Sequence, residues 1–201
     1  MTIPQLTCII TIMKSNNPKL FIFTGPSGVG KGTILADFFK KSDHKIVYSI
    51  SNTTRSPRDG EINGMHYFFV SKDEFEKLIE ENAFLEYAKY SENYYGTNKN
   101  FVEGKIKEGK SVLLEIELQG ALQVMEKCPE AISIFIKPPT FEELEKRLRG
   151  RHTESEEMIS KRLKAARDEL ANANKFKYVI ENDIVDRAVD ELIEVYLKET
   201  R

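Results

Sequence analysis

One short sequence constrains the fold more than any other part of the chain: Gly25-Pro26-Ser27-Gly28-Val29-Gly30-Lys31-Gly32-Thr33. It follows an apolar run and precedes a helical pattern, which is the strand–loop–helix context of a phosphate-binding loop. Glycines permit positive φ, so successive backbone N–H groups can turn inward around an anion, and the helix N-terminus adds its positive dipole end. Lys31 is then expected to reach the β- and γ-phosphates of a nucleoside triphosphate. The alternative, a glycine-rich turn without a ligand, is disfavoured by the spacing, the lysine and both flanks.

The loop departs from the usual pattern at one position. The residue after the lysine is normally Ser or Thr, whose hydroxyl binds magnesium, but here it is Gly32, and the hydroxyl follows at Thr33. We therefore expect Mg²⁺ to be held mainly by phosphates and water, with no secure direct protein ligand. A small GTPase would also need an Asn-Lys-x-Asp sequence to bind guanine. The nearest string, residues 98–101, lacks the Asp, which disfavours that class.

Short apolar runs alternate with helical patterns along the chain, which indicates a parallel sheet with crossover helices. The predicted strands are Leu20–Phe23, Ile46–Ile50, Val112–Leu118, Ala131–Ile136 and Lys177–Ile180. The predicted helices are Gly32–Lys41, Gly120–Lys127 and Asp183–Lys198. We therefore predict an α/β fold whose core is a five-stranded parallel sheet flanked by helices. This core comprises residues 19–50, 101–139 and 172–201.

Two segments interrupt the alternation and are interpreted as insertions into the core. Residues 51–100 are rich in aromatics and turn signals and predict a mixed α/β subdomain, whose helix begins with a capping box at Ser71 and Glu74. Residues 140–171 are charged and helical and predict a lid, because insertions over a rigid sheet are common places for moving segments. Further capping boxes are predicted at Thr140/Glu143 and Thr153/Glu156, with a helix break at Gly150–Arg151.

Composition excludes several classes of function. The 201 residues include 30 basic and 32 acidic side chains, a net charge of −2, so no global field draws the chain to nucleic acid or a membrane. Cys8 and Cys128 are isolated and the three histidines form no cluster, which fits a reducing compartment and predicts neither disulfides nor a zinc site. The apolar stretch Cys8–Met13 is too short to span a bilayer. Residues 1–18 are interpreted as an N-terminal extension, and the protein as cytoplasmic.

Two further groups suggest a second substrate. Arg55 and Arg58 flank a proline in the polar loop Ser51–Arg58, and arginine forks suit bidentate binding of a terminal phosphate. An exposed turn with solvated charges explains them equally well on local evidence. Glu86 lies in the alternating run Phe84–Tyr90, where a carboxylate could accept from both N1–H and the exocyclic amine of guanine. Adenine has no N1–H and would leave that carboxylate unpaired. Alone, Glu86 fits an ordinary exposed glutamate better.

Charged residues at two other places are candidates for the chemistry. Glu115 and Glu117 alternate with apolar residues near the end of a predicted central strand, where α/β sheets bind ligands, and one could orient magnesium-bound water. Arg147 and Arg151 share a helix face if the helix continues through Gly150, and Arg162 follows on the next helix. Solvated charges are the alternative at both places, and a Glu143–Arg147 ion pair would be one example.

In combination, these motifs resemble those of one family. The phosphate loop, Ser51–Arg58, Gly60-Glu61-Ile62-Asn63-Gly64, Tyr67, Phe84–Glu86, Tyr94–Thr97 and Glu115–Gly120 occur in one order that closely resembles the guanylate kinases, from about Lys19 onward. The resemblance implies ATP-dependent phosphorylation of GMP, and of dGMP, in purine nucleotide metabolism. It also implies Mg²⁺ as cofactor, small-molecule substrates as the only partners, and a monomer.

The resemblance also implies roles for individual residues. GMP would be bound by Ser51, Arg55, Arg58, Tyr67, Glu86, Tyr95, Thr97 and Glu115. ATP would be bound by the nine residues of the phosphate loop and by Asn182, for which a helix N-cap is a second role compatible with the first. Catalysis would rest on Lys31, Arg55, Arg147, Arg151 and Arg162. Glu117 and Thr33 would act on the metal through water. Relatives usually carry Asp at the positions of Glu115 and Glu117, so the division between GMP contact and metal role stays open.

Two rival functions remain. One is a catalytically inert guanylate-kinase-like module that binds phosphorylated proteins; such modules typically have eroded phosphate loops, whereas Lys31 and the three lid arginines are intact here. The other is a kinase for another nucleoside monophosphate such as AMP, against which Glu86 argues, together with Ser51 and Thr97.

Overall fold

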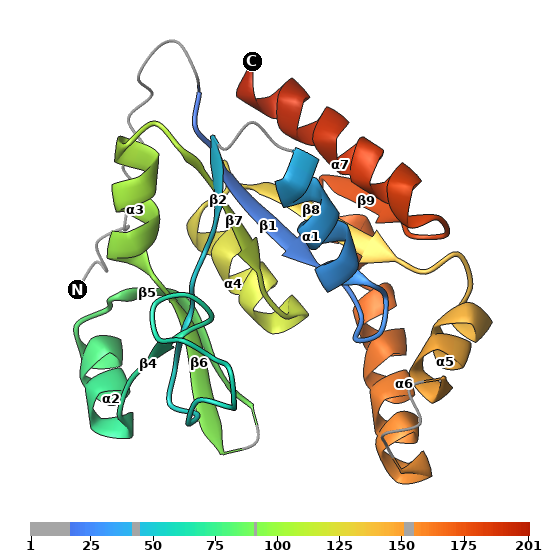
Figure 1. Ribbon diagram of the computed structural model, residues 1–201, viewed down its shortest axis with the longest axis horizontal. Helices are drawn as coiled ribbons and strands as arrows, with labels where there is room; N and C mark the ends of the chain where they lie inside the picture. The colour runs from blue at the N-terminus through green and yellow to red at the C-terminus, as the bar shows by residue number, and fades with distance from the viewer. Residues whose placement is uncertain (1–16, 42–44, 91, 151–154) are drawn as a thin grey trace, which may run out of the picture.

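Two sheets form the framework of the computed structural model, which describes residues 17–41, 45–90, 92–150 and 155–201 (Figure 1). The larger sheet is five-stranded and parallel, in the order β2 (Ile46–Tyr48), β7 (Ser111–Glu115), β1 (Leu20–Thr24), β8 (Ile132–Lys137) and β9 (Tyr178–Glu181). The smaller sheet is four-stranded, in the order β4 (Phe68–Phe69), β3 (Asn52–Thr53), β6 (Asn93–Asn98) and β5 (Phe84–Tyr90). The predicted five-stranded parallel core is confirmed. The predicted extension lies outside the described residues except for its last two.

Helices cover both faces of the larger sheet, as crossover connections between parallel strands require. Helices α1 (Lys31–Lys41) and α7 (Val185–Thr200) pack on one face, and α3 (Lys99–Lys107) and α4 (Leu118–Lys127) on the other. Helix α2 (Lys72–Glu80) lies beside the smaller sheet. Helices α5 (Phe141–Arg149) and α6 (Glu156–Leu170) precede a short 3-10 turn, Ala173–Lys175.

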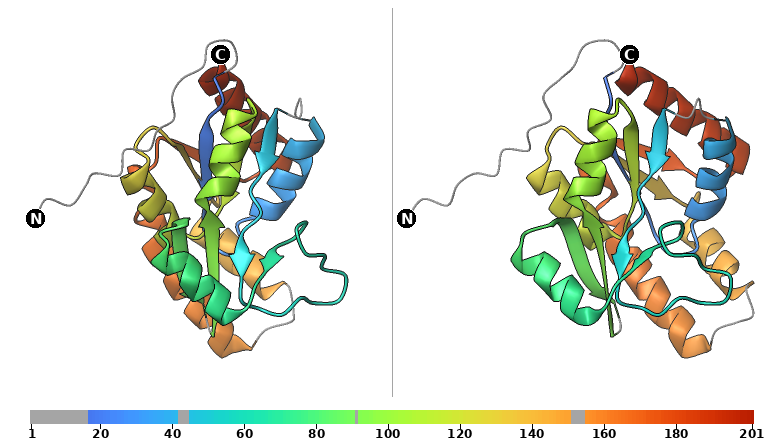
Figure 2. Two further views of the ribbon diagram at one scale, coloured as in Figure 1. Left: turned by 90° about the vertical axis from the view of Figure 1, so that its left-hand side faces the viewer. Right: turned by 60° about the vertical axis from the view of Figure 1, so that its left-hand side comes forward.

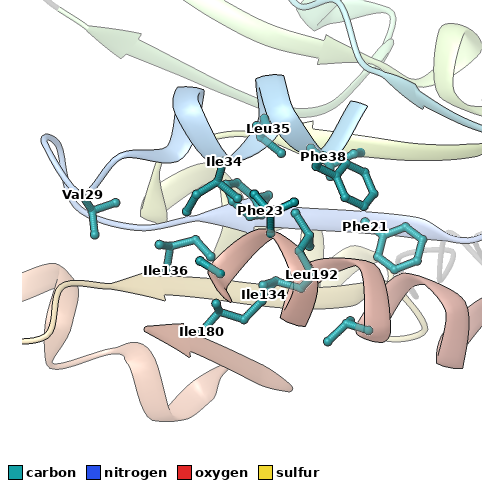
Figure 3. Packing of buried hydrophobic residues seen from close by; sticks show 14 of the residues in the cluster. Phe21, Phe23, Val29, Ile34, Leu35, Phe38, Ile134, Ile136, Ile180 and Leu192 are labelled. Carbon is teal, nitrogen blue, oxygen red and sulfur yellow. The ribbon is translucent and has the colours of Figure 1, made fainter. Parts of the chain in front are cut away.

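The alternation of side chains along β1 explains the two-sided core. Phe21 and Phe23 point to the face covered by α1 and α7, where they pack with Ile34, Phe38 and Leu192 (Figure 3). Leu20 and Ile22 point to the other face and belong to the cluster that includes residues of α3 and α4. Because β1 is buried on both faces, its sequence is a continuous apolar run rather than a polar–apolar alternation.

Both additional units lie beyond the carboxyl edge of the larger sheet. Figure 1 shows the smaller sheet and α2 on one side, and α5 and α6 on the other, and Figure 2 shows both units beyond the same edge. The loop that follows β1 therefore opens toward the space that these two units flank. Ligands of open α/β sheets bind at this edge.

Helix boundaries bear out some expectations and correct others. Ser71 and Glu74 form the predicted capping box, with both bonds present. Thr140 accepts from the Glu143 backbone N–H as predicted, but the Glu143 carboxylate pairs with Arg147. Thr153 lies outside the described residues, but its predicted capping box with Glu156 is wrong, because Glu156 is the first residue of α6 and the N-cap is Ser155, whose hydroxyl accepts from the Met158 backbone N–H.

The strand that carries Glu115 ends earlier than predicted. β7 stops at Glu115, Glu117 is the N-cap residue of α4, and Leu118 begins that helix. The predicted strand over Val112–Leu118 is therefore wrong at its end, and the two glutamates do not alternate along one strand. The residues from Leu118 onward are helical instead, because the chain turns back over the sheet there.

Candidate functional site

The loop after β1 is compact and is held by a hydrogen bond from Asn182. Lys31 Nζ donates to the carbonyls of Gly25 and Pro26, which folds the lysine back over the loop. Gly30 has φ of 99°, which favours glycine, and a Cβ there would lie 2.5 Å from Asn182 Nδ2. That amide donates to the Val29 carbonyl at 2.7 Å, and Asn182 is only 2% exposed. The predicted helix-cap role of Asn182 is wrong, because the N-cap of α7 is Ile184.

Two arginines of the predicted lid reach the same loop from α5 and α6. Arg147 donates to the carbonyls of Val29 (3.4 Å) and Asn182 (3.1 Å) while also pairing with Glu143 at 3.1 Å. Arg162 Nη1 donates to the Ser27 hydroxyl at 2.9 Å. The two guanidinium groups thus come from different helices to one loop. α5 ends at Arg149 with Gly150 as its C-cap, and Arg151 lies outside the described residues.

Oxygen donors suited to magnesium lie near this loop. Thr33 and Glu117 are exposed, and Glu169 of α6 is half-buried close enough to interact electrostatically with both Lys31 and Glu117. Burial raises the pKa of Glu169, whereas Lys31 opposes that rise. Within the described ranges, no three Asp, Glu, His or Cys side chains form a group able to hold a metal ion.

A cavity of about 290 Å³ opens beside the smaller sheet. Five of the residues predicted to bind GMP line it, together with four others: Ser51, Tyr67, Glu86, Tyr95 and Glu115, with Ala88, Ile116, Glu117 and Gly120. Residues that are far apart in the chain, from Ser51 to Gly120, therefore meet around one concave space. Such a concave site with a few polar groups suits a small ligand.

Glu86 is held as a buried acceptor at the wall of this cavity. It is 5% exposed, and its Oε1 accepts from the Thr97 hydroxyl at 2.7 Å. Burial raises the pKa of Glu86, and the hydrogen bonds from Thr97 oppose that rise. The interpretation of Glu86 as an ordinary exposed glutamate is therefore wrong. Thr97 itself is fully buried, and its contribution to the cavity is to orient this carboxylate by a hydrogen bond.

The Arg55 guanidinium is held in a fork by a carboxylate. Glu61 accepts from Arg55 Nη1 at 2.9 Å and from Nη2 at 2.8 Å. The same carboxylate accepts from the Arg58 backbone N–H at 2.7 Å, and the Arg55 guanidinium together with this N–H lowers the pKa of Glu61 to about 2. Arg55 also lies over the Tyr67 ring, 5.4 Å from its centroid, and Tyr67 packs edge-on against Tyr95. Arg55 is thus oriented next to the cavity, while Arg58 is exposed.

Glu115 also has a partner. The Tyr48 hydroxyl donates to Glu115 Oε2 at 2.9 Å, and burial, followed by the Glu115 charge, raises the pKa of Tyr48. Tyr48 therefore stays a neutral donor, and its hydroxyl fixes the orientation of the Glu115 carboxylate at the cavity wall.

Sequence reasoning gave no role to three residues of this site. Tyr48 carried no local signal, because its contact with Glu115 joins two strands of the larger sheet. Glu61 lies in the motif of residues 60–64, and its spacing of three from Arg58 was the available signal for a turn contact. Glu169 lay on the charged face of a predicted lid helix, and only the fold brings it near Lys31.

Comparison with known proteins gives a consistent result. The family model described as Guanylate kinase matches residues 17–199. A guanylate kinase of Streptococcus thermophilus is 51% identical over 176 residues, which cover 88% of this chain and 84% of that protein. A guanylate kinase of Bacillus subtilis is 49% identical over 180 residues, covering 90% and 88%. The crystal structure of guanylate kinase from Anaplasma phagocytophilum superposes with a TM-score of 0.72 at 31% identity, covering 93% of this chain and 88% of that one.

Proposed function

Because the chain belongs to the guanylate kinase family, we propose that it transfers the γ-phosphoryl group of ATP to GMP, giving ADP and GDP. The observation that carries this proposal is the buried Glu86 carboxylate, held by Thr97 at the wall of the cavity. An ionised carboxylate there accepts the two adjacent donors of guanine, N1–H and the exocyclic amine. Adenine would leave it without the N1–H donor, which costs about 1–3 kcal/mol.

The acceptor phosphate is proposed to bind at the Arg55 end of the cavity. A phosphate presents two oxygens as the Glu61 carboxylate does, so it is proposed to compete with Glu61 for the paired N–H donors of Arg55. Tyr67 and Tyr95 add hydroxyl donors beside it. Arg58, exposed and three residues away, is proposed to join when the phosphate is bound.

ATP is proposed to bind on the loop Gly25–Thr33, with its phosphates facing the backbone N–H groups at the start of α1. Asn182 is proposed to act by holding the loop through the Val29 carbonyl. Kinases of this type generally require a divalent metal, and we propose Mg²⁺, because the donors near the loop are the oxygens of Thr33 and Glu117, which suit a hard cation that keeps its water. When bound, Mg²⁺ would neutralise charge on the β- and γ-phosphates.

The chemistry then follows from position and charge. A GMP phosphate oxygen forms a bond to the γ-phosphorus of ATP as the bond from that phosphorus to the β,γ-bridging oxygen breaks, and ADP leaves. The nucleophile is already anionic, so no covalent enzyme intermediate is needed. Lys31, Arg147 and Arg162 are proposed to stabilise the charge on the transferring group, with Arg55 holding the acceptor in line. Arg151 is proposed to assist from the same lid.

The rival functions differ in what they predict. An inert binding module would bind GMP without turnover, and an AMP kinase would prefer AMP. The decisive assay measures ADP release from ATP with GMP, dGMP, AMP, CMP or UMP as acceptor. GMP-dependent release with strong discrimination against AMP is expected. An absence of GMP turnover would sink the enzyme assignment, and a preference for AMP would sink the role of Glu86.

Three coarser properties complete the proposal. Within the described part of the chain, no helix has the length and apolarity needed to cross a membrane. We propose that the protein acts in the cytoplasm as a monomer on small-molecule substrates, without nucleic acid. Sedimentation or size-exclusion analysis of the purified protein, with and without GMP, tests the monomer.

A further inference from the structure

Gly120 makes an unusually close approach to Glu86. It is the third residue of helix α4 and is buried, and a Cβ built there would lie 2.7 Å from Glu86 Oε2 and 3.2 Å from its Cδ. A Cβ essentially never comes within 3.0 Å of a heavy atom outside its own residue and that residue's chain neighbours. Any side chain at this position must therefore displace the carboxylate.

The glycine is not required by the backbone at this position. It lies within a regular helix, where every residue type adopts the same φ, and glycine there is less favourable than alanine by about 1 kcal/mol. The helix therefore gains nothing from this glycine. What it provides is space, and Glu86 fills that space.

The rest of α4 fixes its distance from strand β5. Gln123 and Lys127 follow Gly120 at helical spacing, three and seven residues later, so they lie on the same helix face. Gln123 donates to the Tyr87 carbonyl at 3.4 Å, and Lys127 donates to the Leu85 carbonyl at 2.6 Å. These contacts hold the helix on the two residues that flank Glu86, so the helix cannot easily retreat from an added methyl group.

We propose that Gly120 is a specificity-determining position, because its missing side chain leaves the room in which the Glu86 carboxylate stands. This inference rests on the proposed function, in which Glu86 accepts the guanine donors. A methyl group at position 120 pushes the flexible end of Glu86 away, and the bond from Thr97 is then strained or lost. The added methyl group should weaken recognition of the acceptor base more than it lowers the free energy of unfolding, because the end of a side chain moves while the backbone keeps its position.

The test is the substitution Gly120→Ala, with steady-state kinetics for GMP, AMP and ATP. We expect kcat/KM for GMP to fall about 10- to 100-fold, mainly through KM, with the KM for ATP unchanged. The ratio of kcat/KM for GMP to that for AMP falls with it. The melting temperature stays close to that of the parent, because the gain in helix propensity opposes the local displacement.

A matched control is the same substitution at Gly104. This residue also lies in a helix, α3, but a Cβ there meets nothing within 4 Å. Gly104→Ala is expected to leave all kinetic constants unchanged and to keep or slightly raise the melting temperature. A rescue variant combines Gly120→Ala with Glu86→Asp, whose shorter side chain withdraws the carboxylate from the added methyl. The loss in the double variant is expected to be smaller than the product of the two single losses.

The outcomes separate this inference from the function on which it rests. If Gly120→Ala keeps the GMP-to-AMP ratio while Glu86→Gln loses it, the role of Gly120 is overturned and the base assignment stands. If Glu86→Gln also keeps the ratio, both are overturned. A large fall in the melting temperature of Gly120→Ala, with strictly multiplicative losses in the double variant, would assign Gly120 to packing and overturn the inference.

Discussion

The hydrogen bond from Thr97 to Glu86 is predicted to set the pH range in which GMP is used. The substitution Thr97→Val keeps the shape of the side chain but replaces the hydroxyl, which is 2.7 Å from Glu86 Oε1, with a methyl group. A hydrogen bond to a charged group contributes about 1.5–3 kcal/mol. Loss of this hydrogen bond disfavours the ionised carboxylate by about that amount, so the pKa of Glu86 should rise further above its already raised value.

The sign of the effect follows from the charge that recognition requires. Guanine donates two hydrogen bonds, so Glu86 must be ionised, and kcat/KM for GMP falls as the pH drops through the pKa of Glu86. In Thr97→Val this fall should begin at a higher pH than in the parent. Folding shows the matching pattern. Burial raises the pKa of Glu86 in the folded state above its value in the unfolded state, so ionisation of Glu86 lowers the free energy of unfolding as pH rises. Thr97→Val should therefore lower the free energy of unfolding more at neutral pH than at acid pH.

The assay is the pH profile of kcat/KM for GMP at saturating ATP, which reports groups of the ATP-bound enzyme and of free GMP. The GMP phosphate titrates in both proteins alike, at about pH 6, so the difference between the two profiles isolates Glu86. In a Glu86→Gln background, Thr97→Val should produce no displacement. Thr200→Val, which removes a hydroxyl bonded to the Tyr196 carbonyl at the end of α7, is a matched control and should leave the profile unchanged. Superimposable profiles for Thr97→Val and the parent, or a shift to lower pH, would refute the reasoning.

Three further predictions concern the phosphate loop and its lid. Lys31→Ala should lower kcat by about 10²–10³-fold or more while the protein stays folded, and circular dichroism with an ADP-release assay checks both; near-normal turnover would remove Lys31 from the transfer step. Gly30→Ala should lower the free energy of unfolding by about 1–3 kcal/mol, because its φ is positive and its Cβ would meet Asn182. Urea denaturation measures this loss, and Gly32→Ala, with open space in helix α1, should show none. Arg162→Ala should lower kcat without lowering the melting temperature; a change confined to the KM for ATP would indicate a role in ground-state binding alone.

Local sequence patterns predicted an element correctly where all the residues that define it lie in one short segment. The phosphate loop, the capping box at Ser71 and the apolar run of β1 depend on residues within a few positions of one another, and the structure shows the same elements. Boundaries were less predictable. The alternation through Glu117 suggested a longer strand, but the chain begins helix α4 at Leu118, because packing of that helix on the sheet outweighs a short alternating pattern.

The candidate site was only partly visible in the sequence. Arg55, Glu86 and Tyr95 could be identified by their order along the chain, yet their environments could not. Glu86 by itself suggested a solvated glutamate, and burial against α4 is what makes it a fixed acceptor with a raised pKa. Arg55 suggested an open phosphate site, whereas its fork is held by Glu61.

Local chemistry in the sequence dictates that a phosphate loop joins a buried strand to a helix, because glycine conformation, helix dipole and lysine reach depend on neighbouring residues. The sequence also lays out the order of the charged residues that could serve a second substrate. Which of them face one another is set by the three-dimensional fold: Arg162 against Ser27, Asn182 beside Val29, and Glu86 in the space left by Gly120. These contacts join residues far apart in the chain, and their energies depend on burial and distance, which no local pattern specifies.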